Sequence, residues 1–387
     1  MRRAARMVLA LASLVAAACL WLPAMHLFFR PAADELIRPD GIPPLAARLA
    51  GRHLELWTRP ELLRVELDKM RIANAEWDFM GRSFLAWSLA NMALREPAFA
   101  PRAAAAIDAI LRATLELEAK EGMHFFLMAY GKRRPFLQEP PRSQFIDGEI
   151  ALMLALRRMV EDSPEWRKLL AERVEIMVRR MEANPALSAE SYPDECWTFC
   201  NAVALAAIRL ADHLDGTDHS DLLRRWVALA QRRLIDPQTG LLISAYALDG
   251  KPIYGPEGSS IWMVSHCLVL VDEPFARRQY ELAKRHMAGR LAGFGYAREW
   301  PRGQEHFADI DSGLVLPGTG ASVAYSGLAM VAAGQFGDRE FLRDLAASLE
   351  FLGFPVERDG QLRYAAANQV GEAKSVTESP VSAAHHR

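Results

Sequence analysis

Cysteine and unbalanced charge are both scarce in this chain of 387 residues, and each scarcity excludes a class of protein. Four cysteines are too few for a disulfide framework. None of them lies in the Cys-x-x-Cys or Cys/His spacing that is typical of a zinc site. The 46 basic and 48 acidic side chains give a formal net charge of −2, so no basic field favours nucleic acid as a partner. With 51% hydrophobic and 24% charged residues, we expect an ordinary globular protein without nucleic acid as a partner.

The N-terminus differs from the rest of the chain. Three arginines within the first six residues precede residues 7–29, an apolar run with three interruptions. Roughly 20 apolar residues can span a bilayer. We expect residues 1–29 to be a signal anchor, because Leu20-Trp21-Leu22 continues the run, or a signal peptide cleaved after Ala16-Ala17-Ala18. Either alternative places the domain in the periplasm or on the periplasmic side of a bacterial inner membrane, with this segment as its only membrane contact.

Helical periodicity dominates the chain after residue 58. Residues 30–58 contain several prolines and are predicted to be a linker with at most short helices. Residues 365–387 are polar and are predicted to be a disordered tail. Between them, apolar residues recur with a helical period in eleven segments. These segments are 60–72, 79–95, 101–121, 147–161, 164–183, 195–214, 218–234, 258–271, 274–292, 319–334 and 337–352.

The predicted helices form pairs, with a tight connection inside each pair and a longer loop before it. This repeat predicts an all-α fold, an (α/α)6 toroid of antiparallel helix pairs over residues 59–364, with 44–72 as the source of a sixth pair. Few segments indicate strands. The dipeptide Asp249-Gly250 predicts a hairpin within 241–254, and residues 362–364 are expected to pair with another short strand.

Acidic and aromatic residues recur where the first helix of each predicted pair begins. The five segments are 76–82, 145–149, 192–197, 258–262 and 309–313, and four of them contain carboxylates. Helix capping explains any single acid, and Asp78 with Arg82 also has the spacing of an ion pair. The nearby indoles of Trp77, Trp197 and Trp262 favour a pocket instead, since capping does not require them.

Two further motifs leave alternatives open. Cys196 and Cys200 are expected on one side of the helix 195–214, either as small buried side chains or as a reactive thiol whose pKa the helix start lowers. The spacing Asp309-x-Asp311-x-Gly313 is only part of a calcium loop, since it lacks the third acid and the terminal glutamate, and we predict no metal site.

The middle of the chain is similar to the linalool dehydratase-isomerase family. The matching residues are Asn184-Pro185, Pro193-Asp194, Phe199-Cys200-Asn201-Ala202-Val203-Ala204, Leu214-Asp215-Gly216-Thr217-Asp218, Trp226, Leu234-Ile235-Asp236-Pro237 and Gly240. Weaker similarity extends from about 75 to 364, through Gly148, Asp272-Glu273-Pro274 and Phe336-Gly337-Asp338. The resemblance implies an (α/α)6 barrel, export to the periplasm, a cofactor-free pocket near a subunit interface and a cyclic homo-oligomer. It also implies acid–base dehydration and isomerisation of small terpene alcohols.

The family's site residues transfer unevenly to this sequence. Cys200 falls on one of two active-site cysteines, and Ser191 occupies the place of the other. Glu149 stands where the family has a pocket histidine, Trp262 stands where it has a tyrosine, and Asp78 corresponds to the catalytic aspartate. The resemblance thus implies catalysis by Asp78, Glu149 and Cys200. The substrate-binding candidates are Phe145, Ser191, Tyr192, Asp194, Cys196, Trp197 and Trp262.

Two other functions fit the same residues. One is an (α/α)6 carbohydrate-active enzyme, in which Asp194 or Glu195 forms a glycosidase pair with Asp78 or Glu149. The other is a non-catalytic envelope protein that keeps only the toroid, for which we expect an interior filled by large side chains.

Overall fold

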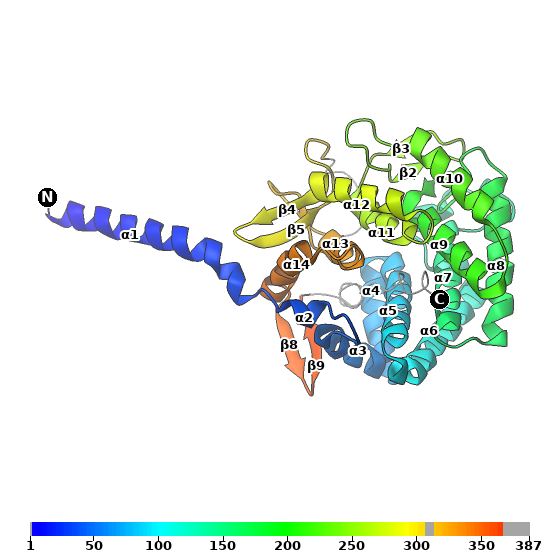
Figure 1. Cartoon of the computed structure of the whole chain (residues 1–387), viewed down its shortest axis with the longest axis horizontal. Helices are drawn as coiled ribbons and strands as arrows, with labels where there is room; N and C mark the ends of the chain where they lie inside the picture. Colours follow the sequence, from blue (N-terminus) through cyan, green and yellow to red (C-terminus); the bar gives the residue numbers. More distant parts are fainter. Residues whose placement is uncertain (1, 306–312, 367–387) are drawn as a thin grey trace.

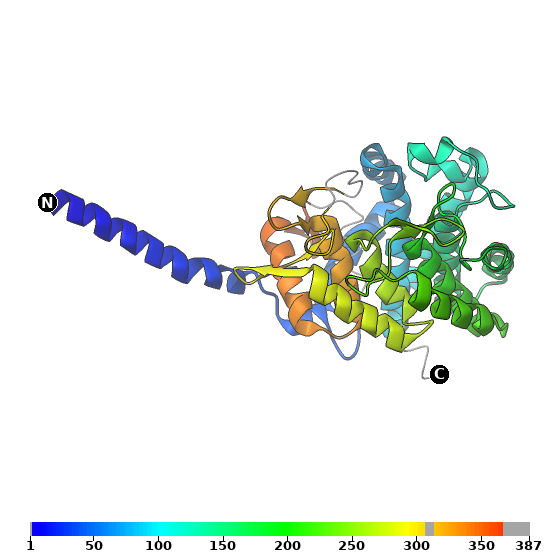
Figure 2. The same cartoon turned by 90° about the horizontal axis from the view of Figure 1, so that it is seen from above.

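The computed structural model describes residues 2–305 and 313–366. The predicted disordered tail therefore lies outside the described residues, apart from its first two positions, and so do Asp309 and Asp311 of the partial calcium motif. Helix α1 (Arg2–Met25) projects away from the body of the protein (Figures 1 and 2). Its apolar stretch, which continues to Phe28, is unburied and is long and apolar enough to cross a membrane as a signal sequence or anchor would.

The described residues after α1 form a ring of six helix pairs, so the predicted (α/α)6 toroid is confirmed. Figure 1 shows the pairs following one another around the ring in chain order, from blue through green to orange. The pairs are α3 (Pro44–Trp57) with α4 (Pro60–Ala73), α5 (Ala75–Arg95) with α6 (Ala100–Glu121), α7 (Gln144–Val160) with α8 (Pro164–Glu182), α9 (Thr198–Asp215) with α10 (Ser220–Arg233), α11 (Gly258–Leu268) with α12 (Glu273–Met287), and α13 (Val323–Gln335) with α14 (Arg339–Leu352).

The inner helices α5, α7, α9 and α11 are buried on nearly every side, whereas the outer helices bury one face. Helices α7 and α9 pack closely at Gly148. A Cβ atom at this position would lie 3.3 Å from the carbonyl oxygen of Cys200 and 3.4 Å from the Cβ of Ala204. The lack of a side chain at Gly148 therefore brings the starts of the two helices together, and with them Glu149 and Cys200.

The first helix pair closes the ring and corrects the prediction of a linker over 30–58. This segment contains α2 (Ala33–Leu36) and the 14-residue α3, whose Leu45 and Leu49 are buried. Pro44 occupies the first turn of α3, where a proline needs no hydrogen-bond partner for its nitrogen. Helix α3 packs against strand β9 (Gln361–Tyr364), which lies about 300 positions later in the sequence. The side chain of Gln361 donates a 2.8 Å hydrogen bond to the carboxylate of Glu55.

Short strands fill the connections between pairs. The predicted hairpin consists of β2 (Ala245–Tyr246) and β3 (Pro252–Tyr254), which β1 (Cys196–Trp197) extends. The expected strand at 362–364 is β9, paired with β8 (Pro355–Arg358). The predicted helix 274–292 ends at Met287, because glycines follow, and a hairpin of β4 (Ala288–Leu291) and β5 (Phe294–Arg298) replaces its last part. Strand β7 (Ala321–Ser322) joins β5, and β6 (Val315–Leu316) joins β7.

Candidate active site

Glu149 is a buried carboxyl group that no cationic side chain of the described residues pairs with. It lies in the first half of α7, completely shielded from solvent. Among the described residues, neither of its carboxylate oxygens has a hydrogen bond of normal geometry. Burial raises the pKa of Glu149 to about 8, and the nearby hydroxyl of Ser83, which favours the charged form, offsets only part of this effect. The side chain is therefore mostly protonated at neutral pH and is able to donate a proton.

Cys200 lies in the first turn of α9, beside Ser191 and within electrostatic reach of Glu149. Burial raises the pKa of its thiol well above the ordinary value, although a hydrogen bond with the side chain of Ser191 favours the thiolate; the charges of Glu76 and Glu149 raise it further. The expectation of a lowered pKa at the helix start is thus wrong, because desolvation outweighs the helix dipole. The contact with Ser191 joins the two positions at which the resemblance implies a pair of cysteines.

A buried tyrosine and four partly exposed side chains form what we call the mouth cluster: Tyr192 with Glu76, Tyr130, Glu195 and Trp197. The hydroxyl of Tyr192 donates to the carboxylate of Glu76 and accepts a 2.8 Å hydrogen bond from a backbone N–H group, while its ring stacks on Tyr130 at 4.4 Å. Glu195 accepts hydrogen bonds from the hydroxyl of Tyr130 at 3.4 Å and from the indole of Trp197 at 3.2 Å. Burial raises the pKa of Glu195. Two carboxylates therefore meet three aromatic rings at the starts of α5 and α9.

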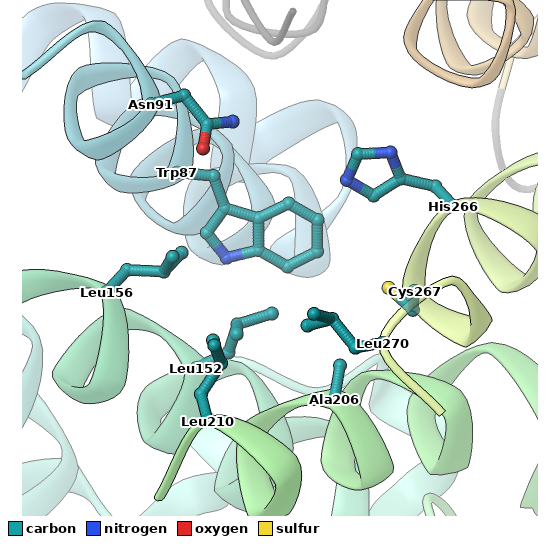
Figure 3. A pocket seen from close by; sticks show the side chains of 9 residues that line it. All are labelled: Trp87, Asn91, Leu152, Leu156, Ala206, Leu210, His266, Cys267 and Leu270. Carbon is teal, nitrogen blue, oxygen red and sulfur yellow. The ribbon is translucent and has the colours of Figure 1, made fainter. Parts of the chain in front are cut away.

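A small cavity lies between the inner helices α5, α7, α9 and α11. Its volume is about 30 Å³, which is the share of one water molecule in the liquid. Its lining is mostly apolar, with Trp87 and His266 facing each other in parallel, their ring centroids 6.3 Å apart (Figure 3). The cavity is lined by Trp87, Asn91, Leu152, Leu156, Ala206, Leu210, His266, Cys267 and Leu270.

The imidazole of His266 supplies a neutral base in this cavity. Burial lowers the pKa of His266 to about 4, so the ring is uncharged at neutral pH. Its Nδ1 atom and the Nε1 atom of Trp87 are buried and have no hydrogen-bond partner among the described residues. Burial, and after it the charge of Glu149, raises the pKa of the neighbouring Cys267 thiol, which places Glu149 within electrostatic reach of the cavity lining. A proton donor and a proton acceptor therefore share the interior of the ring.

Two predicted site residues point away from this interior. Asp78 is buried in an ion pair with Arg82 at 2.7 Å, and the same guanidinium lies 3.5 Å from the hydroxyl of Thr114 on the outer helix α6. The alternative of an Asp78–Arg82 pair is thus what the structure contains, although the pair is buried rather than on the surface. Trp262 packs between helix layers against Tyr280 and Phe341, with centroid distances of 6.1 and 6.0 Å, and does not line the cavity.

The remaining candidates occupy structural positions near the mouth cluster. Phe145 packs edge-on against Phe79 at 5.2 Å. Cys196 lies in strand β1 opposite Tyr246, not on the helix, so it does not share a helix side with Cys200. Asp194 sits in a turn with a positive φ of 60°, and its N–H group donates to the carboxylate of Glu190 at 2.7 Å.

Sequence reasoning did not select Glu76, Trp87 or His266. The available signal was helical phase: Glu76, Ser83 and Trp87 recur at intervals of seven and four residues on α5, which places them on one side. In the described part of the chain, no three His, Cys, Asp or Glu side chains are grouped so that they could hold a metal ion.

Comparison with known proteins places the chain, but not the whole of this site, in a family, because Glu76, Trp87 and Glu149 lie outside the matched residues. A solved structure of unsaturated glucuronyl hydrolase from Bacillus sp. GL1, responsible for the degradation of glycosaminoglycan, aligns with a TM-score of 0.48 and 12% identity, covering 76% of this chain and 83% of the other. The family model for linalool dehydratase/isomerase matches residues 154–370, more than half of the chain, and this segment contains Ser191, Cys200 and His266. The chain belongs to the linalool dehydratase/isomerase family.

Proposed function

We propose that the protein is a cofactor-independent lyase or isomerase that acts by acid–base chemistry on a small, largely apolar alcohol. The observation that carries the proposal is Glu149, a fully buried carboxyl group with no cation beside it and a pKa of about 8. A structural carboxylate is normally paired, as Asp78 is, because an unpaired buried charge is costly. An unpaired, protonated carboxyl group is what protonation of a leaving hydroxyl requires.

The proposed dehydration assigns a step to each group. Glu149 donates its proton to the substrate hydroxyl, the carbon–oxygen bond breaks and water leaves with the bonding electron pair. The imidazole of His266 accepts a proton from the adjacent carbon, whose bonding electrons form the new double bond, and proton return to Glu149 completes the cycle. The thiol of Cys200 stays protonated and donates a hydrogen bond to the substrate oxygen. The indole of Trp87 faces the electron-poor carbon centre, which an aromatic ring stabilises.

The proposal also includes where the protein is located and how it assembles. The apolar helix α1 would hold the ring on the periplasmic side of a bacterial inner membrane, or direct its export to the periplasm. From the resemblance to the family, the proposal also includes a homo-oligomer in which the pocket lies near a subunit interface.

One observation favours a second candidate function, an envelope protein that keeps the ring without catalysis. The cavity of about 30 Å³ holds one water molecule and no alcohol of several carbon atoms, because Trp87 and four leucines fill the space around it. Catalysis therefore requires these side chains to move when a substrate enters between the mouth cluster and the cavity.

Turnover measurements separate the two candidates. The full chain in mild detergent is incubated with allylic and tertiary terpenoid alcohols of five to ten carbon atoms, and alkene and isomer products are measured by gas chromatography. We expect turnover that declines as the pH rises through about 8, where Glu149 loses its proton. Glu149→Gln and Cys200→Ala should abolish it with unchanged circular dichroism, while Glu172→Gln, a change at a half-exposed site on α8, should retain it. Full activity of Glu149→Gln would refute the acid–base assignment.

A further inference from the structure

The β4–β5 hairpin lies directly beside the base of α1. The ring of Phe294 is 6.1 Å from His26 and 6.2 Å from Phe29, measured between centroids. Gly293 at the hairpin turn has a φ of 88°, and a Cβ atom there would lie 2.0 Å from the ring of His26. Figures 1 and 2 both show the hairpin extending toward the point where α1 leaves the body. The tip of the hairpin therefore has a fixed position relative to the end of the apolar helix.

The segment that follows α1 is held firmly on the ring. The ring of Phe29 packs against Phe351 of α14 at 4.9 Å. The guanidinium of Arg30 lies 3.1 Å from the carboxylate of Asp344, and Arg343 donates a 3.0 Å hydrogen bond to the carbonyl oxygen of Pro31. These contacts join α1 to α14 without a flexible linker, so the bilayer that α1 enters must lie next to the hairpin.

The tip of the hairpin exposes an apolar side chain at this position. Leu291 is 63% exposed, and Leu27 and Phe28 at the end of the apolar segment are 60% and 73% exposed. Hairpin turns usually carry polar residues or glycine, so an exposed leucine beside Ala292 is unusual for a turn in water. Arg290 flanks it, 48% exposed, although its guanidinium also pairs with Asp344 at 3.2 Å. Apolar residues flanked by a cation suit the boundary between lipid chains and headgroups.

We propose that the tip of the β4–β5 hairpin inserts into the interfacial layer of the bilayer that α1 spans, as a second membrane contact of this protein. The contact revises the expectation that the membrane is touched through the N-terminal segment only. Figure 1 views the ring face-on, with α1 leaving from its rim, so two contacts on this rim hold the ring with its edge toward the membrane. The face of the ring at which the inner helices start then points parallel to the bilayer surface and not toward the bilayer.

A fluorescent label measures the depth of the tip in the intact chain. The background is Cys19→Ser, because the other three cysteines are buried. Leu291→Cys is labelled with the environment-sensitive dye NBD, and the full chain is reconstituted in vesicles of phosphatidylcholine and phosphatidylglycerol. Ile72→Cys is the matched control, since Ile72 is an exposed apolar residue, 86% exposed, on α4, a helix that lies away from the base of α1 and the β4–β5 hairpin. Circular dichroism checks that both labelled chains are folded.

The two positions should respond in opposite ways. At position 291 we expect blue-shifted emission, strong quenching by lipids brominated on the acyl chains and little quenching by aqueous iodide. At position 72 we expect emission as in water, with quenching by iodide alone. Equal iodide quenching at both positions would overturn the proposal. A mature chain from which mass spectrometry shows α1 to be removed would also overturn it, since the bilayer would then no longer be held beside the hairpin.

Discussion

The substitution Glu149→Gln should remove a pH dependence of stability whose size follows from the burial of this side chain. The pKa of Glu149 rises from an ordinary value of 4.5 to about 8 in the folded chain. A tenfold change in an equilibrium constant is about 1.4 kcal/mol, so folding disfavours the ionised form by about 5 kcal/mol. Between pH 4.5 and about 8 the folded chain keeps a proton that the unfolded chain has released. The free energy of unfolding therefore falls as the pH rises through this window.

Glutamine is uncharged at every pH. The contribution of Glu149 is therefore the difference in the free energy of unfolding between the wild type and Glu149→Gln. Urea unfolding in mild detergent, followed by tryptophan emission between pH 5 and 9, gives the free energy of unfolding of both proteins. The variant should be close to the wild type at pH 5 and gain up to about 5 kcal/mol relative to it by pH 9. Glu172→Gln, whose side chain is 54% exposed on α8, should show no such trend. A constant difference between Glu149→Gln and the wild type across this range would refute the assignment of an unpaired buried carboxyl group.

Three further predictions concern the residues around this group. Arg82→Met leaves the buried carboxylate of Asp78 without its cation and should cost about 3–5 kcal/mol in urea unfolding, most of which the double variant with Asp78→Leu restores. Iodoacetamide at pH 7.5 should leave Cys196, Cys200 and Cys267 unmodified in the folded chain, since burial raises the pKa of all three thiols; rapid labelling of any of these, detected by mass spectrometry, contradicts their placement. Trp262→Phe should cost about 1–3 kcal/mol in stability and leave turnover intact, whereas lost turnover in a folded variant would place this indole in the site.

The ring could be predicted from helical periodicity, because each outer helix must bury one stripe of apolar residues. In α8 the buried side chains include Trp166, Leu170, Val174, Met177 and Met181, which recur at intervals of four, four, three and four residues. Such spacing is visible without coordinates. Closure of the ring was predicted only in part: residues 44–72 were named as the source of a sixth pair, but the prolines of 30–58 were interpreted as a linker, although Pro44 begins α3.

Neighbours that are distant in sequence decide which side chains of α11 face the cavity. Trp262 and His266 are four residues apart on α11, yet one packs on outer helices and the other lines the cavity. The partners that fix these orientations, Phe341 and Trp87, lie about 80 and 180 positions away in the sequence, which no local pattern records. The two alternatives for Cys200 could not be separated for a related reason: the helix start is local, but the burial that raises the pKa of its thiol depends on the whole ring.

Two pairs of acidic residues near the starts of α5 and α7 differ in the side of the helix on which they lie. Asp78 and Asp147 lie on the outer sides of α5 and α7, where Arg82 neutralises the first and Arg142 and Arg173 neutralise the second at 2.5–2.7 Å. Glu76 and Glu149 are two residues from these aspartates, and two residues on a helix turn the side chain by about 200°. They face inward instead, Glu76 toward Tyr192 and Glu149 toward Cys200, and among the described residues the carboxylate of Glu149 has no hydrogen-bonded or ion-paired partner. The helix phase, and not the presence of an acid at a helix start, therefore separates carboxylates that stabilise the ring from those available for chemistry inside it.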